Sequence, residues 1–353
     1  MRLERSVIIT MNIREIAKIA GVSPAAVSLV INNKKGVGED TRKRIISVLE
    51  EYNYTLPKKV NKAPKHILFI KYIKNGMIVE ENTGFISSIM DSIENDCRSQ
   101  GYDLSIIISE NNLESTLSHI NYSNYQGLIF LGTELESCTY PLLEKIPIPF
   151  LVIDNVMPNF NCNCVVMANK EIVNQAVSYL ASLGHKDIAY FRSDMSIQNF
   201  TERSESFYES CNKLNLNFNP KNEFLLTPTL LGAYNSMMAY LEKGIKLPSC
   251  AFADNDTIAI GVIKALKEYH YEIPKDISII GFDDIHFSAI NSPSLTTMNV
   301  PKKLIGSIAL RHLFSSIENP SANSVKSHIG ATLVVRHSTC EYDMNNRALP
   351  IDE

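Results

Sequence analysis

The sequence predicts two parts of different fold class: a small all-α head at the amino terminus and a larger α/β body made of two lobes. Three observations predict this division. Three short segments with apolar residues at helical spacing precede residue 55. Residues 55–65 hold two prolines and four lysines, as a linker would. From residue 66 onward, apolar strands alternate with amphipathic helices, and 353 residues suit one small and one large domain.

The first segment of the head predicts a short helix with one buried face. Asn12, with Glu15 three residues later, has the form of a capping box. Gly21 is a natural stop, because glycine readily adopts the left-handed conformation just past a helix. The apolar residues of this helix recur at helical spacing at Ile13, Ile16, Ala17 and Ala20.

A second helix is predicted to start at Ser23 and Pro24, an N-cap residue followed by the residue best tolerated at the first helical position. Its apolar stripe is formed by Val27, Val30 and Ile31. Two short helices joined by a few residues that include glycine describe a helix-turn-helix motif. A third helix is predicted over residues 41–54, with inward side chains at Ile45, Val48, Leu49 and Tyr52.

The charge is divided unevenly between head and body. Residues 1–65 hold 13 Lys and Arg against 6 Asp and Glu, a net charge of +7, although the whole chain has a net charge of −4. The remainder therefore has a net charge of −11. A basic head on an acidic body is typical of a module that binds nucleic-acid phosphates and is carried by a sensor domain.

Composition excludes several other classes of protein. No apolar run approaches the roughly 18 residues of a membrane span, and no signal peptide is legible, so we expect a cytoplasmic protein. The seven cysteines form no CxxC pair. Cys162 and Cys164 could be metal ligands, but two thiols without a second pair of cysteines are weak evidence for a metal site. We expect reduced cysteines that bind no metal. We expect neither a metal nor a cofactor.

The body predicts two Rossmann-like lobes with a cleft at the carboxyl ends of the strands, because strands that alternate with helices form parallel sheets. Strands are predicted at residues 67–73, 104–108, 127–131, 150–153, 188–191, 249–253 and 278–282. Helices between them are predicted at residues 84–100, 169–183, 257–269 and 301–317.

The segments IREIAKIAGVS, AAVSLVIN, DTRKRI and EEYNY resemble the N-terminal motif of the lactose-repressor (LacI/GalR) family of bacterial transcription regulators. Other segments resemble that family's periplasmic-binding-protein-like (type I) effector domain: LASLGHKDIAYF, ERSESF, ADNDTIAIGVIKAL, IPKDISIIGFDD, SPSLTTM and TLVVRHST. The resemblance therefore covers nearly the whole chain.

The resemblance implies a helix-turn-helix domain at residues 11–54, a hinge at 55–65 and a ligand-binding and dimerisation domain at 66–353. Residues 1–10 precede the family's usual start and are expected to be an extension. The chain would cross between the lobes three times. Lobe 1 would be about residues 66–163 and 300–320, and lobe 2 about residues 164–297 and 324–340.

The resemblance places the second helix in the major groove of an operator. Leu29 stands where many relatives carry arginine, and leucine offers a thymine methyl an apolar contact but cannot form the bidentate bond to guanine. In the hinge, Val60 is the one apolar wedge where relatives use leucine, so its lysines are expected to act through phosphate contacts. The expected DNA-binding residues are Arg14, Ser23, Pro24, Ala25, Ala26, Ser28, Leu29, Asn32, Thr41, Tyr54, Lys58, Lys59 and Val60.

By the same resemblance, polar residues at strand ends line the interlobe cleft. Carboxylates, an amide and a guanidinium beside an aromatic ring suit a sugar, whose hydroxyls donate and accept while its apolar face stacks. A phosphosugar is the alternative if Lys71 and Lys74 reach the cleft. Ser206 stands where the family usually has glycine. The expected ligand-binding residues are Tyr72 or Phe85 as the aromatic platform, with Asp154, Arg203, Asn255, Asp256 and Asp283.

These observations predict a regulator, in particular a repressor, that binds a palindromic double-stranded DNA operator as a homodimer and responds to a small molecule. Two alternatives stay open: control by a partner protein, or a cytosolic ligand-binding or enzymatic domain with a vestigial head. Enzymatic motifs such as GxSxG, GxxxxGK[ST] and HExxH are absent from the sequence. Asp283 with Asp284 is a poor metal pair because adjacent side chains diverge, and His185 is expected to be structural.

Overall fold

The computed structural model describes residues 12–31, 34, 36–52, 54, 65–74, 76 and 83–343. The chain divides into two compact units, Met1–Ala63 and Pro64–Glu353, and the division falls inside the predicted linker. Several predictions lie outside the described residues: the extension at 1–10, most of the hinge, and the expected DNA contacts Asn32, Lys58, Lys59 and Val60.

The head consists of α1 (Ile13–Ala20), α2 (Pro24–Ile31) and α3 (Glu39–Glu51). The capping box predicted at Asn12 is present: its Oδ1 accepts from the backbone N–H of Glu15 at 3.1 Å, and the Glu15 carboxylate accepts from the N–H of Asn12 at 2.7 Å. Gly21 ends α1 with a φ of 65°, a left-handed conformation that glycine adopts without strain.

A small apolar core joins these three helices, with Ile16, Val27 and Ile45 fully buried. The prediction that Tyr52 faces inward is wrong, because its side chain is 44% exposed. Helix α3 ends at Glu51, so Tyr52 is the C-cap and no longer follows the helical stripe. Tyr54 packs against the core instead.

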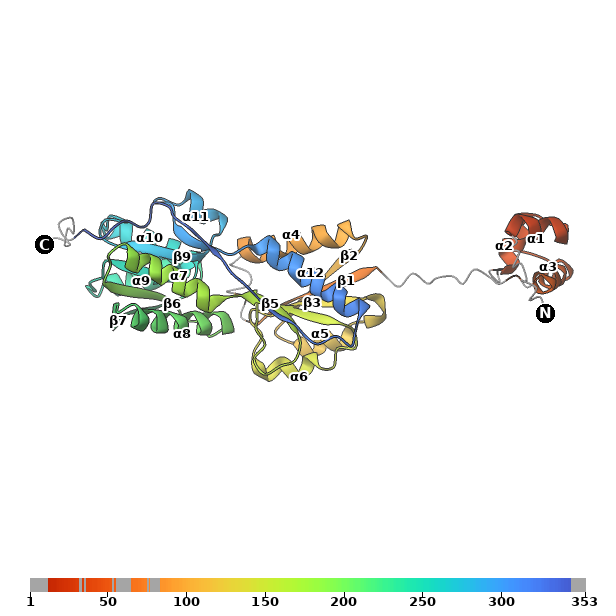
Figure 1. The fold of residues 1–353 in the computed structure, drawn as a ribbon, viewed down its shortest axis with the longest axis horizontal. Coiled ribbons are helices and arrows are strands. Elements are labelled where there is room, and N and C mark those ends of the chain that lie inside the picture. The colour runs from red at the N-terminus through yellow and green to blue at the C-terminus, as the bar shows by residue number, and fades with distance from the viewer. Residues whose placement is uncertain are drawn as a thin grey trace, which may run out of the picture. The chain divides into compact units, whose positions relative to one another are not determined.

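The body contains two six-stranded sheets (Figure 1). The first sheet has the order β11-β5-β4-β3-β1-β2 and is parallel throughout. Its strands are β1 (His66–Ile73), β2 (Asp103–Glu110), β3 (Gly127–Leu131), β4 (Phe150–Ile153), β5 (Asn163–Met167) and β11 (Lys326–Ile329). The second sheet has the order β12-β10-β9-β8-β6-β7, with only β12 antiparallel. Its strands are β6 (Asp187–Ser193), β7 (Asn217–Leu226), β8 (Cys250–Ala253), β9 (Ser278–Asp283), β10 (Thr296–Asn299) and β12 (Thr332–Val334).

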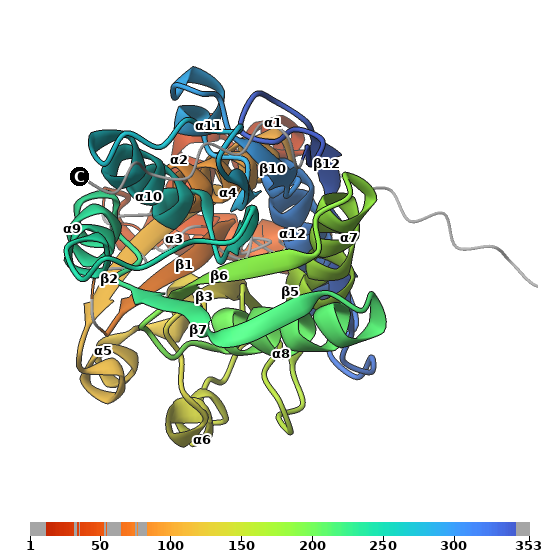
Figure 2. The same cartoon turned by 90° about the vertical axis from the view of Figure 1, so that its left-hand side faces the viewer.

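Helices cover both faces of each sheet, so most central strands are buried on both sides and read as apolar runs. In lobe 1, α4 (Thr83–Ser99) and α12 (Lys302–Glu318) pack side by side on one face, and α5 (Leu113–His119) and α6 (Tyr140–Leu143) cover the other (Figure 1). In lobe 2, α7 (Asn169–Ser182) and α8 (Gln198–Lys213) cover one face, and α9 (Leu230–Leu241) and α10 (Asp256–Glu268) the other (Figure 2). The short α11 (His286–Ile290) follows β9, and 3-10 turns occur at Tyr122–Asn124 and Ser137–Thr139.

The chain passes between the lobes near Ala168, Val300 and Gly330. The predicted lobe boundaries need correction, because β5 and β11 pair within the first sheet. The first segment of lobe 1 therefore extends to Met167, and its second segment extends to Ile329. Among the described residues, no helix is long and apolar enough to cross a membrane.

Candidate functional site

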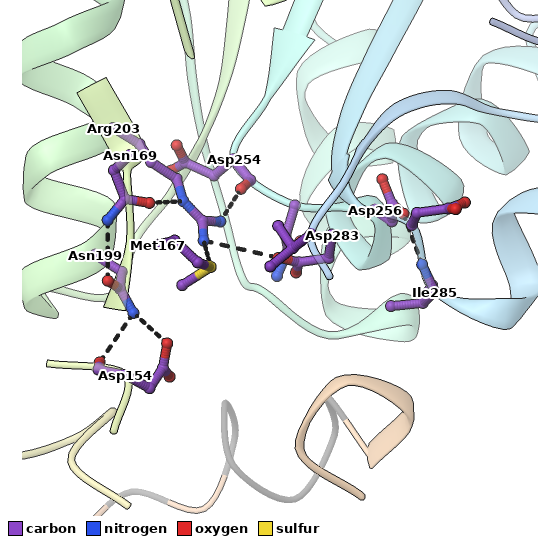
Figure 3. A network of polar contacts seen from close by, with 12 residues as sticks. Asp154, Met167, Asn169, Asn199, Arg203, Asp254, Asp256, Asp283 and Ile285 are labelled. Atoms are coloured by element: carbon purple, nitrogen blue, oxygen red, sulfur yellow. Dashed lines mark hydrogen bonds and ion pairs between the residues drawn. The ribbon is translucent and has the colours of Figure 1, made fainter. Parts of the chain in front are cut away.

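The carboxyl ends of the parallel strands carry a group of buried polar side chains. Asp154 follows β4, Asp254 and Asn255 follow β8, and Asp283 ends β9. All four are at most 5% exposed. Because parallel strands end at the same edge of a sheet, residues far apart in the sequence meet at one edge of each lobe, where the lobes face each other (Figure 3).

Arg203 lies at the centre of this group and is 3% exposed. Its Nε donates to Oδ1 of Asn169 at 3.0 Å, and its Nη1 donates to the backbone carbonyl of Asp254 at 2.5 Å (Figure 3). Its Nη2 lies 3.7 Å from Oδ1 of Asp283. The guanidinium also lies 3.7 Å from the centroid of the Phe282 ring, a cation–π distance. These contacts hold the fork of Arg203 in one orientation.

A chain of amides extends from Arg203 across to lobe 1. Asn169, the first residue of α7, donates its Nδ2 to Oδ1 of Asn199 at 3.0 Å. Asn199 in turn donates its Nδ2 to Oδ1 of Asp154 at 2.9 Å, a bond from lobe 2 to lobe 1 (Figure 3). Thr133 donates its hydroxyl to the other oxygen of Asp154 at 2.5 Å. The network therefore joins the two lobes through directional hydrogen bonds.

Burial dominates the electrostatics of two carboxylates in this network. It raises the pKa of Asp154 to about 6, although hydrogen bonds from Thr133 and Asn199 and the charge of Arg203 favour the ionised form. Burial likewise raises the pKa of Asp254 to about 6, although hydrogen bonds from the Tyr190 hydroxyl and the Ser193 N–H favour the ionised form. Both groups are therefore expected to change protonation near neutral pH if their surroundings change.

The cavity between the lobes is small in this conformation, with a volume of about 20 Å³, enough for one water molecule. Five of the seven expected ligand-binding residues line it: Phe85, Asp154, Arg203, Asn255 and Asp283. The remaining lining residues are Ile86, Thr133, Met167, Ile197, Asn199 and Phe200. Asn255 also caps α10, because its Oδ1 accepts from the N–H of Ile258 at 2.8 Å.

Two expected ligand-binding residues are placed elsewhere, and their assignment to the cleft is corrected. Tyr72 is 4% exposed and packs beside Phe130, on the sheet face covered by α5 and α6. Along β1 alternate side chains face opposite sides, and this alternation turns Tyr72 away from Phe85. Asp256 accepts from Thr297, Ser288 and the N–H of Ile285 at 2.5, 2.6 and 3.0 Å, so it binds α10 to the α11 loop and β10.

Other sequence features lie outside the cavity. Neither Lys71 nor Lys74 lines it, and Lys74 forms a 2.5 Å ion pair with Glu136. His185 bonds to Ser249 at 2.9 Å and to the Cys340 carbonyl at 3.2 Å, a structural role. Cys162 and Cys164 are buried free thiols, and the described part of the chain contains no cluster of three metal-binding side chains. Ser206 donates to the Glu202 carbonyl within α8.

In the head, the expected DNA-binding residues that the structure describes differ in exposure. Arg14, Ser23, Pro24 and Ala25 are exposed, at the starts of α1 and α2. The others are half-buried: Ala26, Ser28, Leu29, Thr41 and Tyr54. A δ-carbon of Leu29 approaches Gly36, so this side chain packs against the loop after α2 while keeping part of its surface.

Sequence reasoning missed Thr133, Asn169, Asn199 and Asp254. Thr133 and Asp254 follow strands β3 and β8 closely, so the strand-end argument that found Asp154 also applied to them. Asn199 stands four residues before Arg203 on α8, and this spacing puts both on one helix face. Asn169 starts a helix directly after β5, a strand that the sequence did not reveal.

Comparison with known proteins matches two family models. Residues 12–56 match "Bacterial regulatory proteins, lacI family" and residues 177–339 match "Periplasmic binding protein-like domain". The chain is 31% identical over 333 residues to the HTH-type transcriptional repressor PurR of Pasteurella multocida (strain Pm70), covering 92% of this chain and 98% of that protein.

Two solved structures share the fold at lower identity. The Lac repressor dimer bound to operator and the anti-inducer ONPF is 21% identical with a TM-score of 0.70, covering 94% of this chain and 100% of that one. The transcriptional regulator CelR in complex with cellobiose is 19% identical with a TM-score of 0.69, covering 93% of this chain and 99% of that one.

Proposed function

The chain belongs to the lacI family of bacterial regulatory proteins, DNA-binding transcriptional repressors with an effector-binding domain rather than enzymes, and we propose that its effector is a neutral sugar bound between the lobes. It would bind a palindromic operator as a homodimer. The observation that carries the proposal is the buried network around Arg203, which presents charged and amide groups from both lobes to one cavity.

The chemistry of the cavity favours a ligand with several hydroxyls. Asp154 and Asp283 accept hydrogen bonds, Asn199 both donates and accepts, and Arg203 donates to paired oxygens. Phe85 and Phe200 provide apolar walls against which a sugar ring packs. The structurally similar CelR is in complex with cellobiose, which also supports a sugar. A phosphosugar is disfavoured because Lys71 and Lys74 do not line the cavity.

A sugar is far larger than one water molecule, so its binding would require the lobes to separate at the bond between Asn199 and Asp154. Hydroxyls of the ligand would then replace this bond and the approach of Asp283 to Arg203. A ligand shifts such an equilibrium only through its different affinity for the two lobe arrangements. Effector control of the paired heads would follow from this shift.

Two exposed apolar pairs support the homodimer. Ile106 and Ile108 on the edge strand β2 are 51% and 56% exposed, and Phe287 and Ile290 on α11 are 55% and 75% exposed. An uncovered apolar edge strand invites pairing with another chain. A second copy is the fitting occupant, because a palindromic operator needs two heads related by two-fold symmetry. One pair lies on each lobe, so a dimer that uses both would respond to lobe movement.

The test is calorimetry with a panel of cellobiose, D-ribose, D-glucose, glucose 6-phosphate and nucleobases on wild type, Arg203→Ala and Asp283→Ala. Each charge-assisted bond contributes roughly 1.5–3 kcal/mol, so each variant is expected to bind the cognate sugar at least about tenfold more weakly. Arg192→Ala is the matched control, because Arg192 pairs with Glu223 outside the cavity.

Operator binding is measured on the same proteins with DNA selected by the wild type. The unliganded variants are expected to bind it like wild type, with a steep dependence on salt. Wild-type affinity for the sugar in both variants would remove the cavity assignment, and a nucleobase as the only ligand would replace the sugar. A wild-type protein without any sequence preference would indicate a vestigial head.

A further inference from the structure

The loop that follows β9 connects the effector cavity with lobe 1. Asp283 and Asp284 have φ values of 107° and 52°, in the left-handed region that residues other than glycine rarely occupy. The carboxylate of Asp283 lines the cavity, and that of Asp284 forms a 2.7 Å ion pair with Arg336. Surrounding contacts must hold this unfavourable backbone in place.

Lys302 provides such a contact from the other lobe. It is the first residue of α12, directly after the second passage between the lobes. Its Nζ donates to the backbone carbonyls of Asp283, Asp284 and Val300, the last two at 3.1 Å. An ammonium group has three N–H donors, so these carbonyls use its full capacity. The ammonium also lies 5.7 Å from the centroid of Phe85, a residue that lines the cavity.

Lys302 is half-buried, and burial lowers its pKa while the nearby carboxylates of Asp283 and Asp284 favour its charged form. A charge in such surroundings is stable only where its donors are satisfied. Lys303, the next residue, is exposed. The two side chains therefore differ in burial, although both are lysines at the start of α12.

We propose that Lys302 is a positioning residue that couples the effector cavity to lobe 1, an inference that rests on the proposed function. A ligand that binds the Asp283 carboxylate would also move the backbone carbonyl of Asp283, because both groups belong to one residue with a left-handed backbone. Lys302 transmits this displacement to α12. Since α12 packs along α4, which carries Phe85, the movement reaches the opposite wall of the cavity.

Lys302 and the bond from Asn199 to Asp154 are thus two separate connections between the lobes, and both involve cavity residues or their backbone. Without the bonds from Lys302, the lobes would be able to move independently of Asp283. The sugar would still meet Arg203 and Asp283 in the cavity. The effect of the sugar on operator binding, which measures the coupling free energy between the two sites, would then fall more than the affinity for the sugar.

The first experiment needs no ligand. Hydrogen–deuterium exchange on the full chain compares wild type with Lys302→Met, the milder Lys302→Gln, and Lys303→Met as matched control. We expect at least about fivefold faster exchange in Lys302→Met at residues 284–290 and also at residues 198–203, across the cavity. Lys302→Gln, with two amide donors, is expected to be intermediate. Unchanged exchange at residues 198–203 in both Lys302 variants would overturn the proposal.

The second experiment uses cellobiose and D-ribose as probes and measures operator affinity with and without sugar. In Lys302→Met, the effect of the active sugar on operator affinity is expected to fall at least about fivefold, by more than the affinity for that sugar falls. An undiminished effect would overturn the proposal. If wild type binds neither these sugars nor D-glucose of the calorimetry panel, the proposed effector class fails, and the exchange experiment still decides the role of Lys302.

Discussion

Replacing Asp256 with asparagine is expected to remove part of the pH dependence of the body's stability. Burial, and secondarily the charge of Asp283, raises the pKa of Asp256 to about 7 from an ordinary value of 3.8. Between these values the folded protein holds a proton that the unfolded chain releases. As far as this group is concerned, stability is therefore highest below about pH 4, and it declines as the pH rises from about 4 to 7.

The difference between these pKa values corresponds to roughly 4 kcal/mol at 1.36 kcal/mol per pH unit, an upper bound for the ionised form above pH 7. Asparagine has no such penalty. Its Oδ1 would accept from Ser288 and the N–H of Ile285, and its Nδ2 would donate to the Thr297 hydroxyl, which can rotate to accept. At pH 8 the variant is expected to be as stable as wild type or more stable, by up to a few kcal/mol.

The assay is urea denaturation of the full chain from pH 5 to 8, followed by circular dichroism because the chain contains no tryptophan. The Asp256→Asn profile should be flatter than that of wild type between pH 5 and 7, the interval in which the two pKa values of Asp256 make wild-type stability fall. Asp91→Asn makes the same change at an exposed position of α4 and should keep the wild-type profile. Parallel profiles for Asp256→Asn and wild type would refute the reasoning, as would an equal loss of stability at pH 5 and pH 8.

Two further predictions concern surfaces. Ile290→Asp should weaken dimerisation at least about tenfold in analytical ultracentrifugation, since a buried apolar anchor contributes roughly 1–2 kcal/mol. The control variant Leu231→Asp, at a position on α9 that is 67% exposed, should not weaken it. A dimer unaffected by Ile290→Asp would exclude α11 from the interface. Leu29→Arg should shift half-site preference toward guanine by roughly 1–3 kcal/mol in a selection from random DNA. Ile19→Arg adds the same charge on α1 and should leave the preference unchanged, and an unchanged preference for Leu29→Arg would count against its position near the bases.

Much of the fold could be predicted because many elements are decided locally. The cap at Asn12 and the stop at Gly21 depend on a few neighbouring residues, and the seven predicted strands lie within two residues of observed ones. Other strands could not be predicted. β10 reads TTMN and β11 reads KSHI, sequences without an apolar run or clear alternation. They are strands because neighbours in the sheet supply their hydrogen bonds.

The site could be predicted only in part. The strand-end rule applied to Asp154, Asn255 and Asp283, because parallel strands bring their carboxyl ends together. The rule does not give the direction of each side chain, which is why Asp256 was misplaced: the first turn of α10 directs it toward α11. The role of Lys302 could not be predicted either, since the carbonyls of Asp283 and Asp284 lie near it only in the folded chain, after the chain has passed from lobe 2 to lobe 1.

The interlobe network is better suited to having its hydrogen bonds replaced by those of a ligand than to stabilising the fold. Asp154 and Asp254 have raised pKa values because their charges are buried, and well-packed apolar residues in their place would often be as stable. Under the proposed function, however, the hydrogen bonds between Asn199 and Asp154 would be replaced by bonds to a ligand's hydroxyls at little net cost, because one set would substitute for another. The balance between two lobe arrangements would then depend on small free-energy differences, and coupling of about 1–3 kcal/mol would be sufficient to control operator binding.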